Sequence, residues 1–478
     1  MASKVYYMND RAGYLSESIP FKALKLCRDI GIDQLVKPGY KVAIKTHMGE
    51  YGNAFNLRPQ WVKVIVDEVK RLGGFPTVLD CNTIATGVAG ARAIEADHLK
   101  TASAHGFNEA TLGCPVIIAD GAYGFDDVEV PVPHGVYMKH TWMGKRLTEF
   151  DACIVVSHFK GHAQGVYGGA IKNIGIGMGS KHGKMATHFW AHPVYGIPNA
   201  DIVQEKARKA AVSGTVKRTR TGAVMLPLQE GEISILDTFI KSCPRKCFEW
   251  TGDEVIFHRE KCTACGNCLN AGGNYGGLFK YKTSLPALWP TLIADAASGY
   301  LHAIGKDRFL FVNYCFDITP LCDCCAFHDR PMIPNLGVFV SRDPVAVDMA
   351  CLEACEAASV VPGSRAEEYG FSEPNTDRFT NSSSAAQISQ WTQINSAVYN
   401  GMGSSEYELV ESVPGPEFEY WPEQYTRDNT FYDQHMHAFE ADTFRFDEYY
   451  LPEQQLSNDE LYKRPAGLVK VSSIQDQK

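Results

Sequence analysis

Three cysteines at short, regular spacing are the clearest chemical signal in this sequence. They form the run Cys262-Thr-Ala-Cys265-Gly-Asn-Cys268. A C-x2-C-x2-C run lets three thiolates on one tight loop bind three irons of a 4Fe–4S cluster. Zinc is the alternative, but structural zinc sites usually pair two C-x2-C knuckles or add histidines. The run therefore predicts an iron–sulfur cluster.

The fourth ligand of this cluster is predicted from two cysteine positions of the ferredoxin pattern. In two-cluster bacterial ferredoxins each run ends in x3-C-P, and its last cysteine binds the other cluster. Here Gly272 stands where that cysteine would be, and Cys243-Pro244 has the form of the end of an earlier run. We expect Cys243 to complete a single cluster by crossed ligation. Cys247 is the competing fourth ligand.

A second group of cysteines lies in the segment VNYCFDITPLCDCCAFHD, and its spacing matches no known site. The group could hold another cluster or a metal ion, with Asp323 or His328 assisting. It could equally be a cysteine-rich loop packed beside the first cluster, or a redox thiol pair. The sequence leaves these interpretations open. The group consists of Cys315, Cys322, Cys324 and Cys325.

Histidines and lysines gather directly after a β-branched run that ends near residue 157. In an open α/β sheet, ligands bind at the loops that follow the carboxyl ends of strands. The glycine-rich stretch 165–179 allows close approach to a ligand, while lysine neutralises an anion and histidine transfers protons. The predicted catalytic residues here are His158, Lys160, His162 and Lys172, and the predicted substrate-binding residues are Asn173 and Lys184.

An earlier loop, KTHMGEYGN at residues 45–53, follows the first predicted strand in the same manner. Lys45 is a further predicted substrate-binding residue and His47 a further predicted catalytic residue, with Glu50 and Asn53 on the same loop. The alternative is a polar turn with a capping role.

Other interpretations of the histidine and lysine segment stay open. Lys181-His-Gly-Lys184 lacks the G-K-[ST] ending of a phosphate-binding loop, which disfavours nucleotide binding. The glycines could instead permit tight helix–sheet packing, with the histidines bonded to buried backbone. A metal on His158 and His162 requires a helix, and Gly161 disfavours one.

The elements that must position these residues have the pattern of an α/β protein with a mostly parallel sheet flanked by helices. Short β-branched runs alternate with helical periodicity, as in a buried parallel sheet. Helical spacing covers 61–72 and stops at Gly73-Gly74, and Asp343-Pro344 begins a helix that runs to about 357. The predicted strands are 41–45, 77–80, 116–119, 152–157, 309–313 and 338–340.

Composition shifts divide the chain into four predicted parts. Residues 1–236 and 286–361 are two parts of one α/β body, the second with the cysteine-rich loop. Residues 237–285 form a small ferredoxin-like iron–sulfur module inserted between them. Residues 362–478 are rich in polar and aromatic side chains and form an irregular C-terminal extension.

The overall composition limits the partners. A net charge of −9 without a Lys/Arg tract argues against nucleic acid and against an anionic membrane surface. The N-terminus lacks a signal or transit pattern and no apolar run reaches about 18 residues, so we expect a cytoplasmic protein. Fifteen cysteines are then metal ligands, redox thiols or core residues rather than disulfides. A small molecule or a protein is the expected partner, and a homo-oligomer is compatible with the sequence.

Five segments resemble the iron–sulfur proteins grouped as domain of unknown function 362. They are KVAIKTHMGEYGN, GGFPTVLDCNT, SHFKGHAQGVYGGAIKNIGIGMGSKHGK, KCTACGNC and LGVFVSRDPVAVD. The resemblance implies an α/β body that carries a ferredoxin-like insert. Many members look as if they have two full cluster runs, whereas this chain keeps one.

The leading functional hypothesis is an iron–sulfur oxidoreductase of anaerobic metabolism. Its cluster would pass electrons from a ferredoxin or flavodoxin-type donor to a small, anionic substrate held by the lysine and histidine loops. One alternative is an electron carrier or binding protein without chemistry of its own. Another is a metallochaperone or cofactor-maturation factor that uses the second cysteine group.

Overall fold

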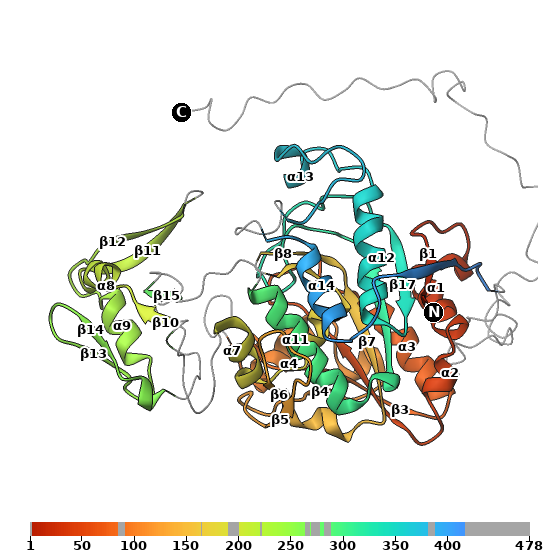
Figure 1. The fold of residues 1–478 in the computed structure, drawn as a ribbon, viewed down its shortest axis with the longest axis horizontal. Coiled ribbons are helices and arrows are strands. Elements are labelled where there is room, and N and C mark those ends of the chain that lie inside the picture. Colours follow the sequence, from red (N-terminus) through yellow and green to blue (C-terminus); the bar gives the residue numbers. More distant parts are fainter. Residues whose placement is uncertain are drawn as a thin grey trace, which may run out of the picture. The chain divides into compact units, whose positions relative to one another are not determined.

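The body of the protein is built on an eight-stranded mixed sheet (Figure 1). The computed structural model describes residues 2–84, 91–163, 165–189, 200–219, 222–262, 268, 278–281, 288–380 and 388–415. In the order in which they lie side by side, the strands are β18 (Tyr407–Glu411), β1 (Ser3–Met8), β17 (Gly337–Ser341), β16 (Phe309–Cys315), β7 (Ala152–His158), β2 (Lys41–Thr46), β3 (Phe75–Asp80) and β4 (Val116–Ile118).

Most neighbouring strands of this sheet are parallel. β16, β7, β2, β3 and β4 all run in one direction, and β18 is parallel to β1. Only β17 is antiparallel to its neighbours, β1 and β16. The predicted α/β fold with a mostly parallel sheet is therefore confirmed.

Two hydrophobic cores cover the two faces of the sheet. Successive residues of a strand point to opposite faces, so Val155 of β7 packs in one core while Ile154 and Val156 pack in the other. Because both faces are covered, the central strands β2, β7 and β16 are buried along almost their whole length. The first core holds α6 (Ala170–Gly175), α11 (Leu288–Ile304), α12 (Pro344–Ala357) and α14 (Trp391–Tyr399), and the second holds α1 (Ile19–Asp29), α2 (Ile32–Leu35) and α3 (Pro59–Arg71) (Figure 1).

Local signals set the ends of these helices. The side chain of Asp343 accepts hydrogen bonds from the backbone of Val345 at 2.8 Å and of Ala346 at 3.1 Å, and Pro344 begins α12. The helix ends at Ala357, as the sequence predicts. In α3, Gly73 follows the last turn with φ of 82°, a conformation that glycine adopts without strain.

Smaller elements complete the body. A hairpin of β5 (Asp127–Pro131) and β6 (His140–Gly144) lies between β4 and β7 in the sequence. A second hairpin, β8 (Lys160–His162) with β9 (Val166–Gly168), follows β7 directly. The remaining helices of this part are α4 (Glu95–Ala104), α5 (Glu109–Leu112) and α7 (Lys181–Phe189).

The cysteine-containing segment has a hydrophobic core of its own. Ala207, Phe239, Phe248 and Leu278 belong to this core, so residues before 237 pack with the predicted module. Its strands form three two-stranded antiparallel sheets: β10 with β15, β11 with β12, and β13 with β14. The elements are β10 (Ala200–Ile202), α8 (Gln204–Ala211), β11 (Ser213–Thr219), β12 (Gly222–Pro227), α9 (Ile235–Lys241), β13 (Phe248–Trp250), β14 (Val255–Phe257) and β15 (Phe279–Tyr281).

The segment after residue 361, predicted to be irregular, contains regular structure in its first part. α13 (Arg365–Glu368) and α14 lie there, and β18 adds a strand to the main sheet beside β1. Residues 416–478 lie outside the described residues. Within the part of the chain that is described, no helix combines the length and the apolar character needed to cross a membrane.

Candidate functional site

The candidate site lies where β2, β7 and β16 end, on the loops that follow them. Backbone hydrogen bonds join these loops: Phe159 donates to Tyr314 at 2.9 Å, Gly161 donates to Thr319 at 2.8 Å, and Glu50 donates to Asp323 at 2.8 Å. Carboxyl ends of parallel strands meet at one edge of a sheet, which is the usual ligand site of open α/β folds. Three distant segments of the sequence are thus fixed against one another.

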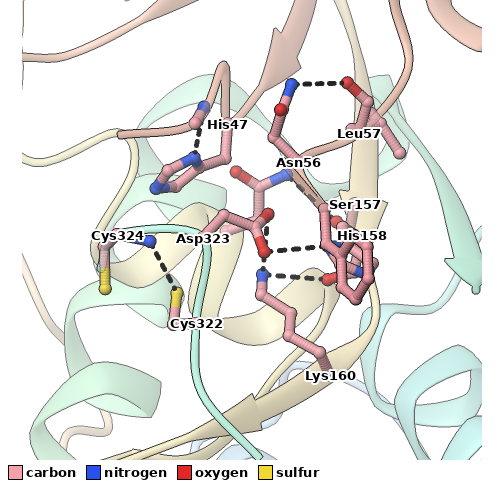
Figure 2. A network of polar contacts seen from close by, with 12 residues as sticks. His47, Asn56, Leu57, Ser157, His158, Lys160, Cys322, Asp323 and Cys324 are labelled. Carbon is pink, nitrogen blue, oxygen red and sulfur yellow. Dashed lines mark hydrogen bonds and ion pairs between the residues drawn. The ribbon is translucent and has the colours of Figure 1, made fainter. Parts of the chain in front are cut away.

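The carboxylate of Asp323 is the centre of this site (Figure 2). One oxygen lies 2.8 Å from Nδ1 of His158, and the other lies 3.5 Å from Nζ of Lys160. Nε2 of His158 lies 2.6 Å from the carbonyl oxygen of Phe316. Both ring nitrogens of His158 therefore face acceptors, so the protonated ring can donate from both. Burial opposes the charge of Asp323, but these two cations outweigh it and hold the pKa of the carboxyl below its usual range.

Two buried lysines face the cysteine-rich loop. Lys160 donates to the carbonyl of His158 at 3.0 Å, and its pKa is raised because Asp323 outweighs the effect of burial. Lys172 donates to Sγ of Cys322 at 3.7 Å. Among the residues that the structure describes, no carboxylate forms an ion pair with Lys172, whose exposed fraction is 7%. The site thus holds more buried positive charge than carboxylate.

One histidine nitrogen and two cysteine sulfurs form a compact cluster beside these lysines. The donor atoms of His162, Cys322 and Cys324 lie within 4.8 Å of one another. Nε2 of His162 is 3.7 Å from Sγ of Cys324, and the ring stacks on Trp289 with centroids 5.4 Å apart. Burial and the nearby Lys172 hold the pKa of His162 well below its usual range, so the ring is neutral. Such a set of nitrogen and sulfur donors is of the kind that soft metal ions prefer.

The loop after β2 contacts the same region, as expected from its sequence. Lys45 donates to Oδ1 of Asn173 at 2.8 Å and pairs with Asp80 at 3.0 Å. Asn53 donates to the carbonyl of Cys325 at 3.1 Å. The His47 ring accepts a hydrogen bond from the backbone of Gly49 at 2.9 Å (Figure 2). Burial, with Arg92 and Lys160 nearby, lowers the pKa of His47 well below its usual value.

Two of the predicted residues lie apart from this site. Lys184 donates to the carbonyl of Gly179, and its pKa is lowered by burial against the influence of Cys81 and Asp120. Cys315 is fully buried in the hydrophobic core with Cys351 and Cys355. The second cysteine group is therefore divided, with Cys315 in the core and its other three members on the loop at the site.

The predicted cluster ligands lie in the separate core of the cysteine-containing segment. Cys268 is buried in that core, and Cys243 and Cys262 pack against it. Cys247 is buried in the same core and donates from its backbone to Sγ of Cys243 at 3.4 Å. Cys265 lies outside the described residues. Thiols from two stretches of chain in one apolar core are a donor set that fits an iron–sulfur cluster.

Comparison with known proteins identifies the family. The family described as domain of unknown function (DUF362) matches residues 42–353. The chain belongs to the DUF362 family. The match confirms the resemblance seen in the sequence motifs and carries no statement about an iron–sulfur cluster.

Comparisons of this DUF362 chain with solved structures and with curated proteins add no functional assignment. The lactate racemase apoprotein from Thermoanaerobacterium thermosaccharolyticum is similar in structure with a TM-score of 0.27 and 13% identity, over 39% of this chain and 41% of that chain. The matched part is less than half of either protein. A search of curated proteins found no match.

Several residues of the candidate site in this DUF362 protein could not be identified from the sequence. Arg92, which pairs with Glu50 at 3.0 Å, and Trp289, which stacks on His162, come from distant segments without a motif. The sequence predicts that Asp323 assists a metal or cluster site of the second cysteine group. In the structure its carboxylate contacts both His158 and Lys160. Asp80 could have been found, because it is the last residue of a strand whose carboxyl end lies at this edge of the sheet.

Proposed function

We propose that this DUF362 protein is an iron–sulfur oxidoreductase that reduces a small anionic substrate between Lys160 and Lys172. The excess of buried positive charge carries the proposal. Lys45 pairs with Asp80, and Arg92 pairs with Glu50. Asp323 is shared by His158 and Lys160, and within the described part of the chain Lys172 donates to the sulfur of Cys322 and to no carboxylate.

A buried charge without a partner costs several kcal/mol. An anion beside Lys160 and Lys172 would remove that cost. This explains why two lysines are kept in a buried site with one carboxylate. It also favours a substrate with a carboxylate or another oxyanion group over a neutral one.

The other polar side chains have roles that follow from their contacts. His158 and Asp323 hold Lys160 in place, since Asp323 contacts both. Asn173 donates to the hydroxyl of Ser157 and accepts from Lys45, so it fixes Lys45 beside β7. Neutral His162 carries one proton, which makes it a hydrogen-bond donor at the site.

The electron source of the proposal is the cysteine-containing segment. Cys243, Cys262, Cys265 and Cys268 would hold a 4Fe–4S cluster, and such a cluster supplies electrons one at a time when bound. A ferredoxin or flavodoxin-type protein would reduce it. The shared apolar core of the three described cysteines supports this ligand set.

Cluster content is the first test. Protein purified without oxygen should contain about four irons and four acid-labile sulfides per chain. Cys268→Ala should lose them, and Cys247→Ala, a buried neighbour that is not a proposed ligand, should keep them. Zinc without sulfide in the unchanged protein would contradict the proposal.

Substrate reduction is the second test. Protein reduced with dithionite is mixed with a panel of small carboxylates and oxyanions, and reoxidation is followed by absorbance. Lys172→Met should slow reoxidation by the active compound at least tenfold, because the charge facing the anion is lost. Lys145→Met, with a side chain 60% exposed on the surface, is the matched control and should react normally. Equal rates in both variants would place the substrate elsewhere.

A further inference from the structure

The loop after β16 brings two sulfurs together and surrounds them with hydrogen-bond donors. Sγ of Cys322 accepts from Nζ of Lys172 at 3.7 Å and from the backbone nitrogen of Cys324 at 3.5 Å. Sγ of Cys324 lies 3.7 Å from Nε2 of His162. Lys172 lowers the pKa of both thiols, but the Cys324 sulfur and burial raise the pKa of Cys322 well above its usual value. The hydrogen bond with Cys322 lowers the pKa of Cys324, and the Cys325 sulfur and burial outweigh it, so the reduced pair consists of two thiols.

The hydrogen bonds of His162 decide which way its proton points. The backbone N–H of Gly165 donates to Nδ1 at 2.8 Å, so Nδ1 carries no proton. The neutral ring then has its proton on Nε2, directed at the sulfur of Cys324. A metal ion on Nε2 would need that proton moved to Nδ1, against the N–H of Gly165. This arrangement favours a cysteine sulfur that accepts a hydrogen bond from His162 over a metal ion bound by His162.

We propose that Cys322 and Cys324 are a redox-active dithiol, which opens and closes a disulfide as it passes two electrons to the substrate. The two sulfurs and the His162 nitrogen lie within 4.8 Å of one another, with Cys322 buried and Cys324 partly buried. The pair converts electrons delivered singly into a two-electron reduction. The identity of the electron donor and of the electron acceptor is taken from the proposed function, and this part of the inference rests on it.

The electrons and atoms of this step balance. Two single electrons from an iron–sulfur donor and two protons from water break the S–S bond and leave two thiols, one beside Lys172 and one beside His162. When the S–S bond forms again, both electrons and both protons pass to an anionic two-electron acceptor. The pair is then again the disulfide with which the cycle began.

Disulfide mapping tests the dithiol without substrate or turnover. The full chain is equilibrated without oxygen in mixtures of reduced and oxidised dithiothreitol, the thiols are trapped by alkylation, and peptides are analysed by mass spectrometry. We expect a Cys322–Cys324 disulfide whose fraction depends on the mixture. Cys315→Ala, which removes a core thiol, and Cys325→Ser, which removes the adjacent thiol, should both leave that dependence unchanged.

A charge variant makes the test quantitative. Lys172 lowers the pKa of both thiols and so favours ionisation of the reduced pair. In alkaline buffer, Lys172→Met should therefore raise the equilibrium constant for disulfide formation about tenfold, which corresponds to one pKa unit. His162→Gln should shift it in the same direction if the first variant fails to fold. Three results would overturn the proposal: no disulfide at the most oxidising ratio, a disulfide that uses Cys325 in place of Cys324, or a stoichiometric metal that both cysteines are needed to retain. Failure of the proposed substrate would leave this measurement unaffected.

Discussion

At the scale of single residues, Asp323 determines the charge of the site. It belongs to the cysteine-rich loop, yet its carboxylate faces His158 and Lys160, which follow β7. One buried anion thus compensates two buried cations from another part of the chain. The position of the loop therefore affects the charge balance of the site. If the loop moved, His158 and Lys160 would both lose their contact with Asp323.

Asp323→Asn should therefore destabilise the protein strongly. The amide cannot compensate the charge of His158 or Lys160, and breaking a buried ion pair on one side costs about 3 kcal/mol or more. Unfolding in urea measures the difference. Asp317→Asn, on the same loop, is the control: its partner Arg58 has a side chain 46% exposed, so the loss should stay below about 1 kcal/mol. Equal losses would mean that His158 is uncharged in the folded protein.

At the scale of elements, the glycine-rich stretch after β9 lets α6 pack closely in the core. A Cβ atom on Gly175 would lie 2.2 Å from the carbonyl oxygen of Ile293 in α11. At the start of α6, Asp348 of α12 accepts hydrogen bonds from the backbone of Ala170 at 2.7 Å and of Ile171 at 2.9 Å. These bonds satisfy two of the N–H groups that the first turn of a helix leaves without partners. Close packing is therefore one use of the glycines, beside any approach to a ligand.

Gly175→Ala should separate α6 from α11. The added methyl group meets the backbone of Ile293 in α11, which cannot turn aside as the end of a flexible side chain can, so we expect a loss of about 1–3 kcal/mol. Gly13→Ala is the matched control, since its Cβ would meet only the end of the flexible Glu17 side chain at 3.3 Å. Thermal unfolding of both variants gives the comparison. A loss in Gly175→Ala no larger than in the control would mean that the two helices move apart without cost.

Elements set by local signals could be predicted from the sequence, and those set by distant contacts could not. The helix that begins at Asp343-Pro344 needs only its own cap and first turn, and it was predicted with its full length. The strand β18 lies in a polar segment, and only its pairing with β1, about four hundred residues earlier, makes it a strand. The lysines and histidines after β7 follow the rule for strand ends. The contact of Asp323 with His158 spans 165 residues and leaves no local pattern.

At the scale of the whole molecule, buried ionisable groups make stability depend on pH in two opposite directions. Four histidines have lowered pKa values, mainly because of burial: His98 and His162, which are buried, and His47 and His188, which are partly buried. Below about pH 6.5 the unfolded chain binds protons at these positions and the folded chain does not, so stability falls as the pH falls. Burial raises the pKa of Asp120 and Asp348 to about 6, so the folded chain binds protons there first and these two add stability as the pH falls from 6 toward 4.

The histidines outnumber these carboxyl groups, so the sum of the six contributions should fall between pH 7 and pH 5, and His98 offers a clean test. Its pKa is lowered to about 3 by burial, with Asp80 opposing the shift. A pH of 5 lies about 1.5 units below the pKa of His98 in the unfolded chain. The unfolded chain binds a proton there and the folded chain does not, which lowers the free energy of unfolding by about 2 kcal/mol. His98→Gln should remove this share, so the variant should lose about 2 kcal/mol less than the unchanged protein when urea unfolding is compared at the two pH values. His140→Gln, with a side chain 57% exposed, should keep the original dependence. If His98→Gln also keeps it, then His98 gains its proton in the folded protein as easily as in the unfolded chain, and Asp80 stabilises that charge enough to cancel the effect of burial.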